Sequence, residues 1–346
     1  MSRRGIFRIN PLLIAAVLAF TAVIFSLIIG SVPIPLSALG KMILQKIPGV
    51  EIQATWPASF STILFDLRFP RTVLIALTGA SLAGSGAAYQ GLFRNPLADP
   101  YLIGVASGAG LGAVIAMSIH WPEKLFGFFT IPFAAFISGM LTVVLVYILA
   151  RVGKTVPTTN LLLAGVSISS FCTALTSYLM IQSQSELRRA IIWLLGGSSM
   201  SGWEPVLAML PYTIIGLGAL LVSGNPLNVL QFGEEQASQL GLNVQKARVI
   251  VILGSSLAAA SAVAFTGIIG FVGLIVPHLV RIVWSGDYRR LIPLSIICGV
   301  TVLLATDIVA RVIIPPQEVP LGIITALVGA PFFLWVLKKS KQQAFW

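Results

Sequence analysis

The sequence predicts an all-α polytopic membrane protein with about ten transmembrane helices. Of its 346 residues, 57% are hydrophobic and only 10% are charged, and the mean hydropathy is +0.95. The apolar residues are grouped in stretches close to the roughly 20 residues that a helix needs to cross a bilayer core. Apolar and polar residues do not alternate inside these stretches, as they would in the strands of a membrane β-barrel. Backbone amides in lipid must be bonded internally, so each stretch is expected to be a helix.

The apolar stretches follow one another along the whole chain. The first follows basic residues but precedes no small-residue cleavage site, so we interpret it as a span rather than a cleavable signal. The run from residue 249 to residue 284 is too long for one span, and we divide it at Thr266-Gly267 because glycine loosens a helix. In order, the predicted spans are residues 11–29, 72–92, 101–119, 131–149, 161–181, 206–222, 249–265, 268–284, 291–314 and 321–337.

Basic residues flank the apolar region at both ends. Lys and Arg favour the cytoplasmic side of a membrane, so both termini are expected inside, which requires an even number of spans. The other basic residues lie scattered at span ends rather than on one face, so the net charge of +11 does not indicate nucleic-acid binding. The flanking residues are Arg3, Arg4 and Arg8 before the first span, and Lys338, Lys339 and Lys341 after the last.

No low-complexity linker divides the chain, so residues 1–346 are expected to form a single transmembrane domain. Two longer segments are expected outside. Residues 32–71 are interrupted by prolines, and residues 182–204 contain the short apolar piece 191–195. That piece is too short to span, and we expect it to lie flat at the membrane interface.

The segment 224–248, between the sixth and seventh spans, is a polar island in this apolar sequence. Its polar residues cluster on what is expected to be a short helix. A membrane protein that keeps one compact polar helix among its spans is expected to use it to contact a partner in the water. The alternative is a solvated loop. The clustered residues are Glu234, Glu235, Gln236, Ser238 and Gln239.

Two spans share an internal similarity. Residues 71–88 align with residues 246–263 at a constant offset of 175, since Gly79 matches Gly254 and 254 − 79 = 175. These are the second and seventh spans, so the two copies would cross the membrane in opposite directions. Inverted repeats of this kind recur in transporters. The alternative is that any two spans rich in alanine and glycine look alike. Further matches are Ser81 with Ser256, Leu82 with Leu257, Ala83 with Ala258 and Ala87 with Ala262.

No motif for a catalytic, metal or cofactor site is present. Gly153-Lys154-Thr155 is the nearest approach to a nucleotide-binding P-loop, but Ile148 stands where the first glycine should be,. His120 and His278 are separated and lack a carboxylate cluster, so both are expected to be structural. Cys172 and Cys298 lie within spans, where cysteine packs as a small hydrophobe. We expect a non-enzymatic protein without a cofactor.

The chain resembles the FecCD-like permeases of ABC importers for iron-siderophores, haem and vitamin B12. The resemblance runs from about residue 67 to residue 338, and its blocks stand in the same order as in that family. They are residues 67–72 (LRFPRT), 90–113, 160–166 (NLLLAGV), 193–197 (WLLGG), 233–242 (GEEQASQLGL), 267–281 (GIIGFVGLIVPHLVR), 305–311 (ATDIVAR) and 320–333 (PLGIITALVGAPFF).

The resemblance implies the inverted-repeat fold of a type II ABC importer permease in a bacterial cell membrane. It also implies partners: ATPase subunits inside, an extracytoplasmic substrate-binding protein outside, and a second permease copy or a paralogous permease. Ferric siderophore is the first expected substrate, followed by vitamin B12 and haem. The alternative is a secondary transporter driven by an ion gradient, which should show buried carboxylates or broken helices near mid-span.

The resemblance also assigns residues to a coupling segment and a cytoplasmic gate. Within the cytoplasmic coupling segment 224–248, residues 233–242 correspond to the short helical pair that seats in a cleft of the ATPase. The gate corresponds to residues just after the second span and at the start of the fifth. For Asn95-Pro96, ordinary turn chemistry is the rival interpretation. The coupling residues are Gly233, Glu234, Glu235, Ala237, Ser238, Leu240, Gly241 and Leu242. The gate residues are Asn95, Leu97, Thr158 and Thr159.

Three arginines, Arg68, Arg71 and Arg311, are assigned by the resemblance to docking of the binding protein. Arginine suits this role because its guanidinium forms bidentate, charge-assisted bonds with carboxylates. The rival interpretation is internal pairing, since Asp66 neighbours Arg68 and Asp307 lies one helical turn before Arg311. Both interpretations remain open at this point.

Overall fold

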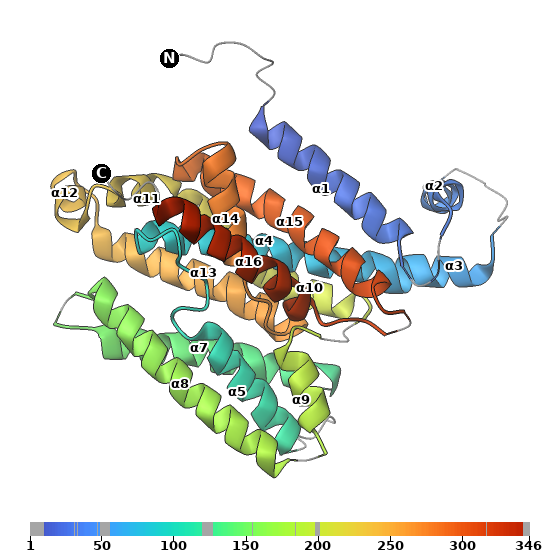
Figure 1. The fold of residues 1–346 in the computed structure, drawn as a ribbon, viewed down its shortest axis with the longest axis horizontal. Helices are drawn as coiled ribbons and strands as arrows, with labels where there is room; N and C mark the ends of the chain where they lie inside the picture. The colour runs from blue at the N-terminus through green and yellow to red at the C-terminus, as the bar shows by residue number, and fades with distance from the viewer. Residues whose placement is uncertain are drawn as a thin grey trace.

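A computed structural model shows an all-helical protein among the residues that it describes, as the predicted fold class requires (Figure 1). Arg3, Arg4, Arg8, His120 and Lys154 lie outside the described residues. The structure describes residues 10–30, 32, 34–46, 48, 56–119, 127–153, 155–183, 185–197, 201–315 and 317–341.

Each predicted span coincides with a helix. Seven helical stretches in the described part are long and apolar enough to cross a membrane, and three more are apolar but shorter. The helices are α1 (Pro11–Ile28), α4 (Phe69–Leu92), α5 (Val105–Ser118), α7 (Thr130–Ala150), α8 (Thr158–Gln182), α10 (Glu204–Val222), α13 (Val244–Thr266), α14 (Val272–Val283), α15 (Tyr288–Val312) and α16 (Leu321–Lys341).

Short helices occupy the segments between the spans. The polar island begins with two of them, α11 (Gly224–Leu230) and α12 (Glu234–Gln239), and then continues into α13. The apolar piece predicted at the interface belongs to the amphipathic α9 (Leu187–Leu194). The remaining short elements are α2 (Leu36–Gln45), α3 (Ala58–Thr62), η1 (Ile63–Arg68) and η2 (Gly127–Phe129).

The second span starts earlier than the sequence predicts. Helix α3, the π-helical η1 and α4 form one continuous stretch of 35 residues, Ala58–Leu92, whereas the prediction began at residue 72. Pro70 has no backbone N–H group to donate to the preceding turn. The helix widens to the π form in η1, which ends at Arg68, two residues before Pro70. The residues expected in an irregular outer segment therefore extend the helix instead.

The division of the long apolar run at Thr266-Gly267 is confirmed, although the eighth span begins later than predicted. Helix α13 ends at Thr266, and Gly267 has φ of 77°, which only glycine adopts readily,. A Cβ at Gly267 would also overlap the carbonyl oxygen of Trp193. Helix α14 begins only at Val272, because Phe271 also lies in the left-handed region with φ of 68°.

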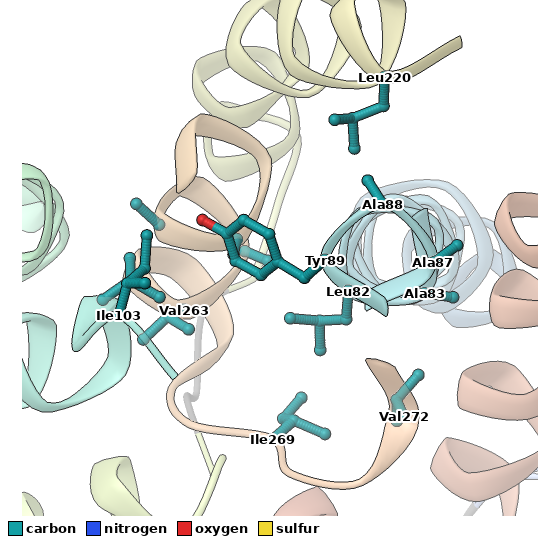
Figure 2. Close-up of a cluster of buried hydrophobic side chains, with 14 of the residues drawn as sticks. Leu82, Ala83, Ala87, Ala88, Tyr89, Ile103, Leu220, Val263, Ile269 and Val272 are labelled. Carbon is teal, nitrogen blue, oxygen red and sulfur yellow. The ribbon is translucent and has the colours of Figure 1, made fainter. Parts of the chain in front are cut away.

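Helix α4 lies at the centre of the molecule and contacts α10, α13, α14 and α15. Figure 2 shows Tyr89 reaching out from α4, and its hydroxyl lies 3.0 Å from Ser256 Oγ of α13. Ser85 Oγ donates to Ser255 O, and Tyr89 OH, one turn later, donates to Ile252 O, three residues earlier. Helix α4 follows α3 at one end of the molecule, whereas α13 follows α12 at the other end (Figure 1). The two similar helices therefore run in opposite directions, as an inverted repeat requires.

Glycines allow the central helices to approach each other closely. A Cβ at Gly79 of α4 would overlap the carbonyl oxygen of Gly299 of α15, and a Cβ at Gly299 would overlap that of Gly79. A Cβ at Gly86 would overlap the carbonyl oxygen of Gly273 of α14. Helices without a hydrophobic force between them associate through close van der Waals contact, which these positions permit.

Two pairs of short helices lie at opposite ends of the molecule. In Figure 1, α11 and α12 project at the left end, whereas α2 and α3 lie at the right end. The gate and coupling predictions therefore concern the left end of the helix bundle, and the docking arginines, which begin α4 and end α15, belong to the other.

Candidate functional site

Asp307, near the end of α15, is the centre of a charged cluster. Its side chain is completely buried between two arginines. Arg71 Nε and Nη2 donate to Asp307 Oδ1 at 3.0 and 2.8 Å, and Arg311 Nη2 lies 3.0 Å from Oδ2. Arg71 Nη1 also donates to Glu318 Oε2 at 2.7 Å. The cluster joins the start of α4, the end of α15 and the segment before α16.

Arg68 is held separately, by backbone oxygens at the end of α1. Its Nη1 donates to Leu27 O at 3.0 Å and to Ile28 O at 2.9 Å, and its Nη2 donates to Val32 O. The last carbonyl groups of a helix lack partners within the helix, so the guanidinium satisfies them. These hydrogen bonds leave Arg68 only 6% exposed.

A cavity of about 600 Å³ opens beside this cluster. The side chains of all three arginines line it, together with Glu318 and residues that end α9 and begin α16. Arg68 and Arg311 are nearly buried, whereas the Arg71 side chain remains 29% exposed. Arg71 is therefore the most accessible of the three to a partner at this end of the molecule.

The internal pairing that the sequence left open is present for Arg311 and, unexpectedly, for Arg71. The described hydrogen bonds of Arg68 go to backbone oxygens rather than to Asp66. Sequence reasoning missed Glu318. A signal was available, because Glu318 is the only acidic residue between Asp307 and the end of the sequence.

The coupling prediction falls on an exposed helix. Gly233 has φ of 107° and turns the chain into α12, whose first turn holds Glu234 and Glu235. Acidic side chains are favourable there because the N-terminal end of a helix carries partial positive charge. Ala237 is fully buried and anchors the helix, whereas Leu240 is 68% exposed. The helix thus presents polar and apolar side chains to a partner.

Glu234 is the coupling residue that reaches a neighbouring span. Its Oε1 accepts a hydrogen bond from Thr158 Oγ1 at 3.4 Å and forms an ion pair with Nη2 of Arg248. Arg248 is 2% exposed, and its side chain also meets Gln245 Oε1 at 3.4 Å. The structure thus brings a predicted gate residue into contact with a predicted coupling residue.

The other gate predictions lie in a turn and on a helix end. Asn95 Oδ1 accepts a hydrogen bond from Leu97 N at 2.9 Å, so the turn chemistry expected for Asn95-Pro96 is present,. Arg94, directly before it, has φ of 49° and is exposed. Leu97 is 38% exposed, and Thr159 is exposed in the first turn of α8. Exposure leaves these side chains free to approach other chains.

A second set of polar contacts, which the sequence did not predict, connects α11 to the start of α15. Asn228 Nδ2 donates to Asp287 Oδ1 at 2.6 Å, and Tyr288 N donates to Asn228 Oδ1 at 2.9 Å. The hydrogen bonds from Arg289 and then Asn228 hold the pKa of Asp287 well below its usual value. Asp287 therefore stays ionised and caps the first turn of α15,.

Asp99, in the turn between α4 and α5, carries a perturbed carboxyl group. Burial raises its pKa to about 6, against a lowering effect of the 2.8 Å hydrogen bond from Tyr101 N to Oδ1. A raised pKa in the folded state means that protonation stabilises the fold. This contribution is complete below the unfolded value of 3.8 and is lost as pH rises through about 6,.

Asp99→Asn is therefore expected to remove a pH dependence of stability. The amide keeps an acceptor for Tyr101 N but cannot ionise. At pH 8 the variant should be more stable than the original chain by about 1–2 kcal/mol, since part of the shift is screened by water. Near pH 4 the two should be equal. Thermal unfolding in detergent across this range measures the difference, and parallel curves at every pH would contradict the assignment.

The described residues hold no group of three or more His, Cys, Asp or Glu side chains that could bind a metal. Within the described part, Asp307 is the carboxylate that is fully buried in a span, and two arginines neutralise it. The candidate site therefore consists of the charged cluster around Asp307 and, at the other end of the molecule, the exposed helix α12, which contacts the first turn of α8.

Comparison with known proteins gives a consistent result. The model of the FecCD transport family matches residues 17–339. The chain is 40% identical to the cobalamin import system permease protein BtuC of Halobacterium salinarum, over 90% of this chain and 87% of that protein. It is 38% identical to the hemin transport system permease protein HmuU of Yersinia pestis, over 81% of this chain and 84% of that protein.

A solved structure shares the fold. It shows an inward-facing conformation of a metal-chelate type ABC transporter, with a TM-score of 0.79 and 31% identity. The similarity covers 95% of this chain and 99% of the other. The agreement extends over nearly the whole length of both chains.

Proposed function

This chain belongs to the FecCD transport family of ABC importer permeases, and from that premise we propose that it is the non-catalytic, membrane-spanning subunit of an ATP-driven metal-chelate importer. The exposed helix α12 carries the proposal, because its acidic first turn projects from the bundle yet contacts α8 and α13. An ATPase seated on the coupling segment 224–248 could then move the spans. In this arrangement both termini are cytoplasmic.

The proposed assembly contains further chains. A second permease copy would complete the pathway, ATPase subunits would bind at α12, and a substrate-binding protein would dock at the opposite end. The secondary-transporter alternative is not favoured by the described spans. An ion-coupled carrier needs an ionisable group in its pathway, whereas Asp307 is fully buried and paired with Arg71 and Arg311.

Reconstitution tests the importer proposal. The chain is placed in proteoliposomes with the ATPase subunit and with the binding protein loaded with chelate. Uptake is expected only when ATP and the ATPase are present. Replacing Glu234 and Glu235 together with alanine should abolish co-purification of the ATPase, whereas Glu318→Gln at the other end should not. Uptake by the chain without any ATPase would overturn the proposal.

The chelate is proposed by class. A binding protein that holds the substrate would leave the permease only to pass it, which suits a pathway with few charges. We propose ferric siderophore first, with cobalamin and haem as the other candidates. Stimulation of ATPase activity in the complete complex, measured with each chelate in turn, identifies the substrate.

Arg71 is proposed as the principal contact for an acidic surface of the binding protein. In the free chain, Glu318 already occupies Arg71 Nη1 and is itself 52% exposed. Glu318 would therefore compete with a carboxylate of the partner. Glu318→Gln should tighten binding by about threefold to tenfold, because it frees Arg71 and makes the surface more positive.

The affinity of the purified binding protein for the detergent-solubilised permease measures this effect. Glu204→Gln is the matched control, since it removes an exposed carboxylate at the start of α10 without freeing Arg71. Its affinity should stay within about twofold of the original. Weaker binding by Glu318→Gln would show that Glu318 supports docking instead of competing with it.

A further inference from the structure

We propose that Glu234 is a positioning residue that transmits the movement of α12 to the gate at the start of α8. One carboxylate links three parts of the chain: it belongs to α12, accepts a hydrogen bond from Thr158 of α8 and pairs with Arg248 of α13. The inference rests on the proposed importer function, and it adds the atoms through which the coupling helix and the gate are joined.

Arg248 fixes the position of the Glu234 carboxylate. The guanidinium is almost completely buried in the second turn of α13, and its side chain is 3% exposed. A buried guanidinium without its carboxylate is costly, so the pair holds together while α12 and α13 move. Glu234 remains 44% exposed on its other side. It therefore bridges a buried charge to the surface that the ATPase would contact.

Thr158 is the first residue of α8, so a bond to its hydroxyl acts on the end of the helix. Pro157 precedes it in an extended conformation, and its side chain does not cap the helix. Proline also has no backbone N–H group that could donate a hydrogen bond. The Thr158–Glu234 hydrogen bond links residues 76 positions apart in the sequence. A displacement of α12 would therefore be transmitted to the first residue of α8.

The residues before Glu234 meet the other predicted gate segment. Gln231 Nε2 donates to Gly91 O at 3.0 Å, at the end of α4. A Cβ placed on Gly233 would lie 3.6 Å from Nη1 of Arg94, which directly precedes Asn95. Gln231 and Glu234 thus contact the end of α4 and the start of α8, and the guanidinium of Arg94 lies beside Gly233. Both gate segments converge on the beginning of α12.

Glu235 offers a contrast within the same turn. It is exposed, and the contacts described for the first turn of α12 to α8 and α13 are made by Glu234. Leu242 N donates to Ala237 O at 3.0 Å and closes the end of α12, so the helix is a compact unit. We assign the transmission of the α12 movement to Glu234. We assign Glu235 to the surface that contacts the ATPase.

The test follows the start of α8 while nucleotide binds. Leu163, one turn into α8 and 67% exposed, is replaced by cysteine in a chain whose Cys172 and Cys298 are replaced by alanine. The permease–ATPase complex is treated with a maleimide, with and without ATP and vanadate. The ratio of the two labelling rates should be roughly fivefold in the parent chain, a size typical of coupling between sites.

Thr158→Val removes the hydroxyl at nearly constant size and should bring this ratio close to one. Thr158→Ser keeps the hydroxyl and should restore the parent ratio. Thr155→Val is the matched control, because Thr155 Oγ1 donates locally to Val152 O at 3.2 Å. Co-purification of the ATPase is measured for every variant, so that lost assembly is not mistaken for lost transmission.

The outcomes separate the two proposals. An unchanged ratio in Thr158→Val, with the ATPase still bound, overturns the role of Glu234 and leaves the importer function standing. A parent chain that neither retains an ATPase nor responds to nucleotide overturns the importer function, and the transmission role falls with it. Equal losses in Thr155→Val and Thr158→Val would indicate a general disturbance of the α8 end and would also reject the assignment.

Discussion

Gly86→Ala is expected to prevent the central helices from packing. A Cβ at this position would overlap the carbonyl oxygen of Gly273, and neither backbone can turn aside as a flexible side chain would. Helix α4 also contacts α10, α13 and α15, so a shift away from α14 would disturb these contacts too. We expect a loss of about 3 kcal/mol or more, at the upper end of the cost of overpacking.

The fraction of chain that stays monodisperse in detergent after heating measures this loss. Gly218→Ala is the matched control: it places the same methyl group on α10, at a glycine with nothing within 4 Å of the added Cβ. The control should retain its folded fraction. Equal stability of the two variants would mean that α4 and α14 do not approach as closely as the structure shows.

Asp307→Asn should be the most damaging change in the charged cluster around Asp307. The amide has nearly the shape of the carboxylate but carries no charge, so Arg311 would be left buried without a counter-ion. Removing one partner of a buried ion pair typically costs about 3–5 kcal/mol. Arg71 limits the damage, because its side chain is 29% exposed and keeps Glu318. We therefore expect about 3 kcal/mol.

Glu318→Gln provides the comparison for stability as well as for docking. Glu318 pairs with the same arginine but is 52% exposed, and an exposed ion pair contributes at most about 1 kcal/mol. Thermal unfolding of the two variants should therefore differ clearly. If Asp307→Asn unfolded at the same temperature as Glu318→Gln, the buried pairing of Arg311 would contribute little, and the cluster would be free to serve docking alone.

The helix boundaries show which features could be predicted from the local sequence and which could not. The break at Gly267 was predictable because glycine in a long apolar run has a local effect. The late start of α14 was not, because the left-handed Phe271 packs against Gly329 of α16, far along the chain. Similarly, prolines suggested an irregular segment before residue 72, but the chain accommodated Pro70 with a π-helical turn.

The candidate site could likewise be predicted only in part from the sequence. The polar character of residues 224–248 identified a helix that projects from the bundle, since polar side chains avoid lipid wherever they occur. The partner of each charge was harder to predict. Asp307 was correctly expected near Arg311, one turn away, but its pairing with Arg71 joins residues 236 positions apart. Arg248 gave no local pattern that would have placed it in the site, whereas Glu318 was marked only as the one acidic residue after Asp307 in the printed sequence.

The sequence by itself determined which segments cross the membrane, because the cost of placing polar groups in lipid is set residue by residue along each stretch. It also determined which segment forms the polar helix that projects from the bundle. Only the tertiary structure decided which charges meet: Arg71 with Asp307, and Glu234 with Thr158 and Arg248. Such contacts depend on how the helices rotate and cross, and those angles are set by close packing at glycines from several helices at once.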